Sequence, residues 1–271
     1  MSESKRPLVL ISNDDGIDTP GIKALADAME SVAEVYVIAP AENQSAVSHK
    51  LSLHHIIRLK RYSERRIAVF GTPVDCVYLA INGLMARKPD LILSGINVGP
   101  NLGTDVHYSG TVGAAVEGTI AEVSSIAISC VSRREANYKH AAEFTRGLAL
   151  RVLANGGLPV GTTLNVNVPK GEPREVQRTY LGHRPYQHSI ERREDPRGGE
   201  YFWIGGDPLL DIEEDPGGDG DAVRNGRISV TPMILDTTGY EYARDFPMDV
   251  EGYEERPFIA PPEGHKLGSW R

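Results

Sequence analysis

Two adjacent carboxylates, Asp14 and Asp15, directly follow the short apolar run of residues 8–12. A run of this length that stops at polar residues is typical of a buried strand in a parallel sheet, and such sheets bind ligands at the carboxyl ends of their strands. Two like charges so close together need a counter-cation, and carboxylate oxygens suit hard divalent ions such as magnesium and manganese. The alternative is that both aspartates cap the next helix. The residues alone leave both interpretations open.

The elements that position these carboxylates alternate between strand-like and helix-like patterns. The expected strands are 8–12, 35–39, 67–70, 90–94, 126–130 and 163–169, and the expected helices are 21–31, 73–86, 111–122 and 138–154. Such alternation is typical of an α/β fold in which a mostly parallel sheet is covered by helices on both faces. We expect the polar loops that follow the strands to meet at one edge of that sheet.

The composition of the chain changes from about residue 170. Charged residues, glycine and proline dominate there, isolated strand candidates lie at 176–181, 201–204 and 228–235, and residues 211–223 form an acidic, glycine-rich loop. Because this part has too few apolar residues for a core of its own, we expect a core at 1–170 and a β-rich arm region at 171–271. The arm region is expected to pack on the core and on neighbouring subunits, and the tail after Glu254 to be poorly ordered unless it docks on a neighbour.

A second candidate site lies in residues 94–115, which are rich in glycine, asparagine, serine and threonine. Ser109, Gly110 and Thr111 precede an expected helix and offer backbone N–H groups, two hydroxyls and the positive end of the helix dipole, which suits phosphate. Serine at this place is also an ordinary helix N-cap. The carboxylates and neutral oxygen donors of the other loops favour a phosphate site, since a purely structural role does not require them.

Composition and missing motifs exclude several classes of function. The 271 residues carry a net charge of −8, which argues against binding to duplex nucleic acid. No apolar stretch approaches the length of a membrane span, and only two cysteines occur, which predicts a cytoplasmic protein with no membrane partner. Dinucleotide, P-loop and nucleophile-elbow motifs are absent from the sequence. The doublet of aspartates also lacks the spacer of DxD phosphatases, so activated water is the better nucleophile candidate.

Four segments resemble the SurE family of survival proteins, metal-dependent 5'-nucleotidases that act on nucleoside monophosphates. They are ISNDDGIDTPGI, APAENQSAVSHKLSL, VFGTPVDCVYLAINGL and PDLILSGINVGPNLGTDVHYSGTVGAAVEGTI. Weaker similarity in TLNVNVP, RTYLGHRPY, DPRGGEYFWIGG and GRISVTPM extends the resemblance over about residues 8–238. It implies a Rossmann-like three-layer core and a homodimer or homotetramer built through exchanged C-terminal segments. It also implies one divalent metal ion per subunit, held by Asp14, Asp15, Ser45 and Asn97.

The residues and the resemblance together predict a phosphomonoesterase for nucleoside 5'-monophosphates, with 3'-monophosphates and short polyphosphate as further candidate substrates. The metal, magnesium or manganese, is expected to activate the attacking water, and either Asp14 or Asp15 could orient that water as a base. Ser109, Gly110 and Thr111 would hold phosphate oxygens. Asn43 or Asn101 would stabilise the charge of the transition state. His107 is either a general acid for the leaving group or a solvated bystander.

The chain departs from the family pattern near the expected serine ligand. Ala46 stands where the family usually has glycine, and His49 stands where asparagine is more usual, so the loop would be stiffer or the Ser45 oxygen shifted. Two further interpretations of the whole chain remain open. One is a non-catalytic nucleotide-binding or regulatory module, and the other is a structural oligomer in which the glycines and carboxylates only cap helices. Phosphate release with and without a chelator distinguishes the three.

Overall fold

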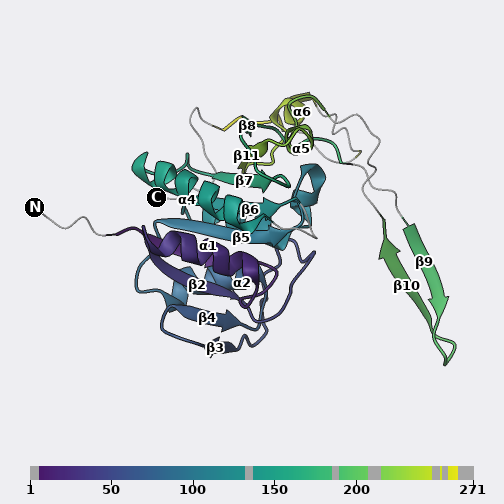
Figure 1. Ribbon diagram of the computed structural model, residues 1–271. Coiled ribbons are helices and arrows are strands. Elements are labelled where there is room, and N and C mark those ends of the chain that lie inside the picture. The colour runs from purple at the N-terminus through teal and green to yellow at the C-terminus, as the bar shows by residue number, and fades with distance from the viewer. Residues whose placement is uncertain are drawn as a thin grey trace, which may run out of the picture.

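The protein is described by a computed structural model that covers residues 6–131, 137–184, 189–206, 215–245, 251 and 256–261. A nine-stranded sheet with the order β3-β4-β2-β1-β5-β6-β7-β11-β8 forms its centre (Figure 1). Its strands are β1 (Leu8–Ser12), β2 (Glu34–Pro40), β3 (Leu59–Arg61), β4 (Arg66–Val69), β5 (Leu91–Val98), β6 (Ser125–Cys130), β7 (Thr162–Val168), β8 (Val176–Arg178) and β11 (Ile228–Ile234).

The sheet is mostly parallel, as the alternation of strands and helices predicts. The six strands from β4 to β7 in the sheet order run parallel, while β3 pairs antiparallel with β4 and β11 pairs antiparallel with β7. β1 lies between β2 and β5, and all of its residues are buried. The order of the strands reverses at this point, because the chain adds strands first on one side of β1 and then on the other. Open α/β sheets bind their ligands at such a switch point.

Helices cover both faces of the sheet and complete three layers. α1 (Pro20–Glu30) and α4 (Tyr138–Ala154) lie side by side on one face (Figure 1), and α2 (Pro73–Leu79) and α3 (Gly110–Ile120) pack together on the other. Side chains alternate between the faces along β1, because successive residues of a strand point in opposite directions. Val9 and Ile11 join the cluster under α1 and α4, whereas Leu8 and Leu10 join the cluster that includes α2. The α/β fold class is therefore confirmed.

Several elements differ from those expected. The helix expected at 73–86 divides into α2 and a short π-helix (Ala80–Leu84), and the strand expected at 176–181 ends at Arg178. β3 was not expected, since its three residues are all exposed and show no apolar pattern. The acidic stretch 211–223 is not wholly a loop, because α5 (Asp219–Arg224) begins within it; residues 211–214 lie outside the described part of the chain. Another short helix, α6 (Tyr240–Asp245), follows β11.

The region after residue 170 contributes to two sheets. β8 and β11 extend the core sheet, whereas β9 (Ser189–Glu194) and β10 (Glu200–Gly205) form a separate antiparallel hairpin that projects from the body of the molecule (Figure 1). A boundary at residue 170 thus stays a proposal. Of the tail after Glu254 only residues 256–261 are described, so the expectation for its order lies largely outside them. None of the helices in the described ranges has the length and apolar character needed to span a membrane.

Candidate functional site

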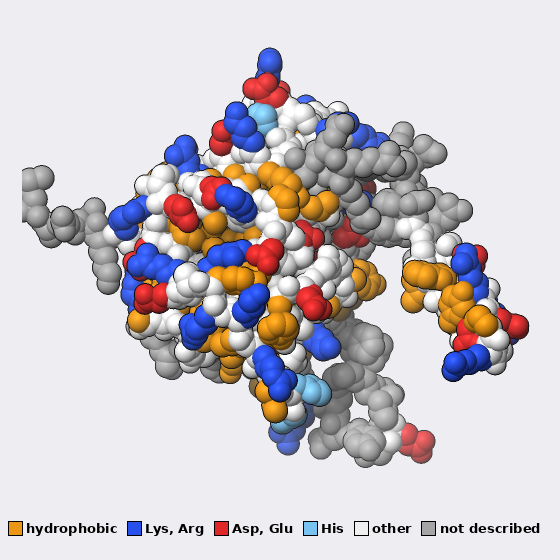
Figure 2. Space-filling view, turned by 60° about the horizontal axis from the view of Figure 1, so that its bottom comes forward, with side chains coloured by type: hydrophobic (Ala, Val, Ile, Leu, Met, Phe, Trp, Pro, Cys, Tyr) orange, Lys and Arg blue, Asp and Glu red, His pale blue; other side chains and the backbone are white. Residues whose placement is uncertain are grey.

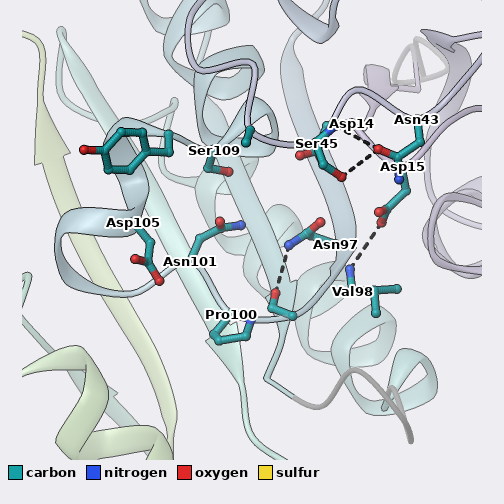
Figure 3. A pocket seen from close by; sticks show the side chains of 13 residues that line it. Asp14, Asp15, Asn43, Ser45, Asn97, Val98, Pro100, Asn101, Asp105 and Ser109 are labelled. Carbon is teal, nitrogen blue, oxygen red and sulfur yellow. Dashed lines mark hydrogen bonds between the residues drawn. The ribbon is translucent and has the colours of Figure 1, made fainter. Parts of the chain in front are cut away.

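A pocket of about 550 Å³ opens at the carboxyl ends of β1, β2 and β5, and we call it the site pocket (Figure 3). Seven of the predicted site residues line it, namely Asp14, Asp15, Asn43, Ser45, Asn97, Asn101 and Ser109. Gly110 and Thr111 do not line it and lie directly behind Asp14. Loops separated by up to 95 positions in the sequence therefore meet at the switch point of the sheet, where the sequence pattern places them.

The loop that carries the two aspartates is closed by the preceding residue, Asn13. Its side chain is fully buried, donates to the carbonyl of Gly16 at 2.9 Å and to the hydroxyl of Thr19 at 3.0 Å, and accepts from the Gly16 amide at 3.2 Å. Gly16 has a φ of 113°, a conformation that L side chains rarely adopt. Asn13 and Gly16 therefore fix the turn that presents both carboxylates to the site pocket.

Asp14 is a buried carboxylate held from behind by the start of α3. The hydroxyl of Thr111 donates to its Oδ1, and burial of the group, with a smaller contribution from the charge of Asp15, raises its pKa from 3.8 to about 6. A Cβ atom on Gly110 would lie 2.9 Å from the Asp14 Cβ, so only glycine lets the helix approach so closely. The ionised form of Asp14 is thus disfavoured by the protein itself, and a cation beside it would restore it.

Asp15 and Asn97 face the site pocket from the neighbouring strands β1 and β5. The Val98 amide donates to Oδ2 of Asp15 at 3.2 Å, and burial raises the pKa of this carboxyl too. The Asn97 Nδ2 donates to the Gly99 carbonyl at 2.8 Å, a bond that does not involve the amide oxygen of Asn97 (Figure 3). Two carboxylates and one amide oxygen therefore gather at one place.

The loop after β2 supplies Asn43 and Ser45. The Oδ1 of Asn43 accepts from both the amide and the hydroxyl of Ser45, at 2.8 and 2.6 Å, so Asn43 orients the serine (Figure 3). Ala46 has a φ of 57°, in the left-handed region that favours glycine. The departure from the family pattern at this position thus places a strained alanine beside the candidate ligand. His49 fastens the far end of the loop to α3 through a 3.1 Å contact with Glu117.

Asn101 is fixed by a buried polar network. Its amide donates to Oδ1 of Asn167 at 2.9 Å, its Nδ2 donates to the Ser129 hydroxyl at 2.8 Å, and its carbonyl accepts from the side chains of Asn165 and Asn167. These partners come from β6 and β7, so the central strands hold the loop after β5 in place. The sequence contained a signal for this network, because Asn165 and Asn167 alternate along one strand and must share a face.

The segment from Ser109 to Thr111 combines structural and binding features. Ser109 is the N-cap of α3, and its hydroxyl accepts from the Val112 amide at 3.1 Å. The hydroxyl of Thr111 is fully buried and donates to Asp14, so it positions the carboxylate and does not reach the site pocket. The N-terminal end of α3 still faces the site pocket through Ser109, which keeps the positive end of the helix dipole beside it.

Two groups near the expected site lie elsewhere. Asp75, in the loop after β4, is fully buried and forms a capping box with Thr72 at the start of α2. It also accepts from the Ser52 amide at 2.8 Å, so this loop has a structural role. His107 is exposed and does not line the site pocket, although its carbonyl accepts from the Ser48 hydroxyl at 2.5 Å. Asp105 and Tyr108, which the sequence analysis did not single out, do line it.

The residues present fit a hard divalent cation. Carboxylate, amide and hydroxyl oxygens are the donors that magnesium and manganese prefer, and Asp14, Asp15, Asn97 and Ser45 supply all three kinds in one pocket. Within the described residues there is no cluster of three or more histidine, cysteine, aspartate or glutamate side chains. The candidate set therefore differs from zinc and iron sites in its chemistry, and two buried like charges supply the reason to bind a cation.

Comparison with known proteins agrees with this geometry. The family model described as "Survival protein SurE" matches residues 9–188, about two thirds of the chain. The chain belongs to the SurE family. Relatives named "5'-nucleotidase SurE" include one from Moorella thermoacetica, 44% identical over 246 residues, which cover 88% of this chain and 94% of the relative. Another, from Geotalea daltonii, is 48% identical over 237 residues, covering 86% and 94%.

A solved structure shows that this SurE chain shares its fold with other members of the family. The crystal structure of the SurE protein from Aquifex aeolicus aligns with a TM-score of 0.79 at 39% sequence identity. The alignment covers 89% of this chain and 98% of the other. The resemblance of the NDDG, serine-loop and SGIN segments therefore reflects common descent and not chance similarity of short motifs.

Proposed function

We propose that the protein is a metal-dependent 5'-nucleotidase that hydrolyses nucleoside 5'-monophosphates to nucleoside and phosphate. The observation that carries this proposal is a pair of carboxylates with raised pKa values in one pocket with the N-terminus of α3. Such a pair favours a cation, and the helix end favours an anion beside it. The curated relatives named 5'-nucleotidase support the same activity.

Asp14, Asp15, Ser45 and Asn97 would hold one divalent ion per subunit, magnesium or manganese. When bound, such an ion polarises a phosphate oxygen and lowers the pKa of a coordinated water, from 15.7 to roughly 7 in favourable sites. Within this set Asp14 is the most constrained member, because Thr111 and Gly110 fix its position. Asn43 holds the Ser45 hydroxyl ready through a 2.6 Å hydrogen bond.

The protein's own groups bind the phosphate and move the proton. The N-terminal end of α3 offers backbone N–H groups near Ser109, and these would donate to phosphate oxygens. The Nδ2 of Asn43 or of Asn101 would donate to the charge that develops in the transition state. With a pKa of about 6, Asp14 is mostly ionised at neutral pH, so either it or Asp15 can accept a proton from the attacking water.

The leaving group and the further substrates are less constrained by the structure. His107 lies outside the lining of the site pocket, which favours its interpretation as a bystander. Activity on 3'-monophosphates and on short polyphosphate stays part of the proposal, supported by the size of the pocket, about 550 Å³, which exceeds the needs of a phosphate group alone.

The test is phosphate release from AMP, GMP and p-nitrophenyl phosphate, with and without EDTA, followed by manganese or magnesium. We expect release to stop in EDTA and to return with the metal. Asp14→Asn should abolish metal-dependent release, whereas the matched variant Asp27→Asn, at an exposed carboxylate that pairs only with Lys23 across one helical turn, should retain it. Binding of nucleotide without release would instead favour the non-catalytic module, and indifference to EDTA would refute the metal site.

We further propose that the protein assembles as a homodimer or homotetramer through its C-terminal arm. Ile190, Phe202 and Ile204 share one face of the β9–β10 hairpin and are all exposed, Ile204 by 88% (Figure 2). An isolated two-stranded hairpin is marginally stable in water, so this apolar face needs a partner surface. Ile190→Lys with Ile204→Lys should convert the oligomer to monomers in light scattering, and an unchanged mass would refute the role of the hairpin.

A further inference from the structure

The wall of the site pocket farthest from the carboxylate pair carries two groups with no part in metal or phosphate binding. Asp105 comes from the 3-10 helix Gly103–His107, and Tyr108 follows it. Both line the site pocket, and Asp105 lies across it from Asp15 and Asn97 (Figure 3). The ring of Tyr108 is 69% exposed, although large aromatic side chains are usually well covered.

The backbone around Asp105 is rigid because the C-terminal part of the chain braces it. Asp219 is almost fully buried, and its carboxylate accepts from the amides of Gly103 at 2.8 Å and Gly182 at 3.0 Å. The Ser48 amide donates to the carbonyl of Tyr108 at 3.0 Å. The wall is therefore fixed from both sides before any ligand binds, and pre-organised groups bind ligands at lower entropic cost.

The charge of Asp105 is balanced by Arg184. The Nη1 of Arg184 lies 3.3 Å from Oδ2 of Asp105, and both side chains are mostly buried. Without this partner a third carboxylate would repel a phosphate ester from the site pocket. The two oxygens of a carboxylate offer about four acceptor sites, so an ion pair through one oxygen leaves capacity to accept from hydroxyl groups.

We propose that Asp105 and Tyr108 bind the nucleoside part of the substrate, Asp105 by accepting hydrogen bonds from the ribose hydroxyls and Tyr108 by stacking on the base. This inference rests on the proposed nucleotidase function and adds its specificity. A carboxylate is an acceptor only, and the two ribose hydroxyls are the donors that every ribonucleotide offers. Stacking on an aromatic ring accepts any base, since each base has a π-face. The wall therefore selects ribonucleotides as a class and discriminates little between bases.

The test compares kcat/KM for AMP, GMP, CMP, 2',3'-dideoxy-AMP, ribose 5-phosphate and p-nitrophenyl phosphate in the manganese-loaded protein. We expect AMP to exceed the dideoxy analogue by about tenfold, the size of a hydrogen bond to a charged group. AMP should exceed ribose 5-phosphate by about tenfold or more, the size of one base stacking on an aromatic side chain. AMP, GMP and CMP should agree within about threefold, because stacking tolerates any base.

Variants assign each preference to its residue. Asp105→Asn should lower kcat/KM for AMP about tenfold more than for the dideoxy analogue, since only AMP offers the hydroxyls. Tyr108→Ala should lower the value for AMP more than for ribose 5-phosphate, whereas Tyr108→Phe should stay close to the parent. The Tyr108 side chain can be removed cleanly because the backbone, and not the ring, makes the bond to Ser48. Tyr78→Ala, at an exposed tyrosine of α2, is the matched control.

The outcomes separate this inference from the proposed function. Equal losses on AMP and on the dideoxy analogue in Asp105→Asn would mean a structural role and overturn ribose binding. A parent protein that hydrolyses all six substrates with similar kcat/KM would overturn the nucleoside wall while the phosphatase activity stands. A parent protein that releases phosphate from none of them would overturn both. Because the comparison of AMP with its dideoxy analogue needs only the parent protein, a variant that fails to fold does not prevent the decision.

Discussion

Replacing Asp14 by asparagine should stabilise the metal-free protein while destroying its metal site. The side chain keeps its size, and its amide oxygen can still accept from the Thr111 hydroxyl that now binds Oδ1. What disappears is a buried negative charge beside Asp15. Charges buried without a counter-ion cost stability, so a functional carboxylate of this kind is expected to destabilise the fold that holds it.

The size of the effect follows from the pKa of Asp14. Burial raises this pKa from 3.8 to about 6, and each unit corresponds to 1.36 kcal/mol, so the ionised carboxylate costs about 3 kcal/mol. The folded state binds the proton more tightly than the unfolded state. The associated stability is therefore complete below pH 3.8 and is lost as the pH rises through about 6. The asparagine variant should gain about 3 kcal/mol over the parent at pH 8 and roughly half of that at pH 5.

Urea unfolding in EDTA at pH 5 and pH 8 measures this gain. Asp27→Asn, which alters an exposed carboxylate paired with Lys23, should change the free energy of unfolding by less than about 0.5 kcal/mol. Manganese should raise the stability of the parent and leave the Asp14→Asn protein unchanged, because only the parent binds the ion. Equal unfolding free energies of parent and variant at pH 8 would show that Asp14 carries no buried charge and would refute the reasoning.

Three further substitutions examine the groups around the carboxylate pair. Thr111→Val removes the hydroxyl that donates to Asp14 and should raise the pKa of Asp14 and weaken manganese binding about tenfold in calorimetry; unaltered affinity would contradict the positioning role. Ala46→Gly relieves a φ of 57° and should raise the free energy of urea unfolding by about 1 kcal/mol, whereas a loss would show that the alanine is not strained. Asn167→Ala leaves the buried amide of Asn101 without its acceptor and should cost about 1–3 kcal/mol by the same measurement, with an unchanged stability arguing against the network.

Strong local patterns made most of the core predictable from the sequence. β1 is five buried residues that end at polar ones, and α4 has the bounds that its apolar spacing predicts, residues 138 to 154. The carboxylates and the loops with Ser45, Asn97 and Ser109 could be placed together because parallel strands end at the same edge. The capping role of Asp75 was also readable, since Thr72 and Pro73 precede it at the spacing of a capping box.

Features that depend on distant contacts could not be read in the same way. Thr111 looks like a phosphate ligand in the sequence, and its buried bond to Asp14 spans 97 positions. β9 consists of six exposed residues with four charges, so it lacks the apolar alternation by which strands are predicted. The ion pair of Asp105 with Arg184 depends on how the arm region folds back on the core. Local pattern therefore located the site, and tertiary contacts decided the role of each residue.

The binding of one divalent ion by Asp14, Asp15, Ser45 and Asn97 is the central claim, and anomalous diffraction from a manganese-soaked crystal tests it most directly. The account predicts a single strong anomalous peak per subunit, within bonding distance of oxygen atoms of these four side chains. It also predicts that the peak vanishes in crystals of the Asp14→Asn variant. A peak elsewhere, or none with both carboxylates turned to solvent, would contradict the account.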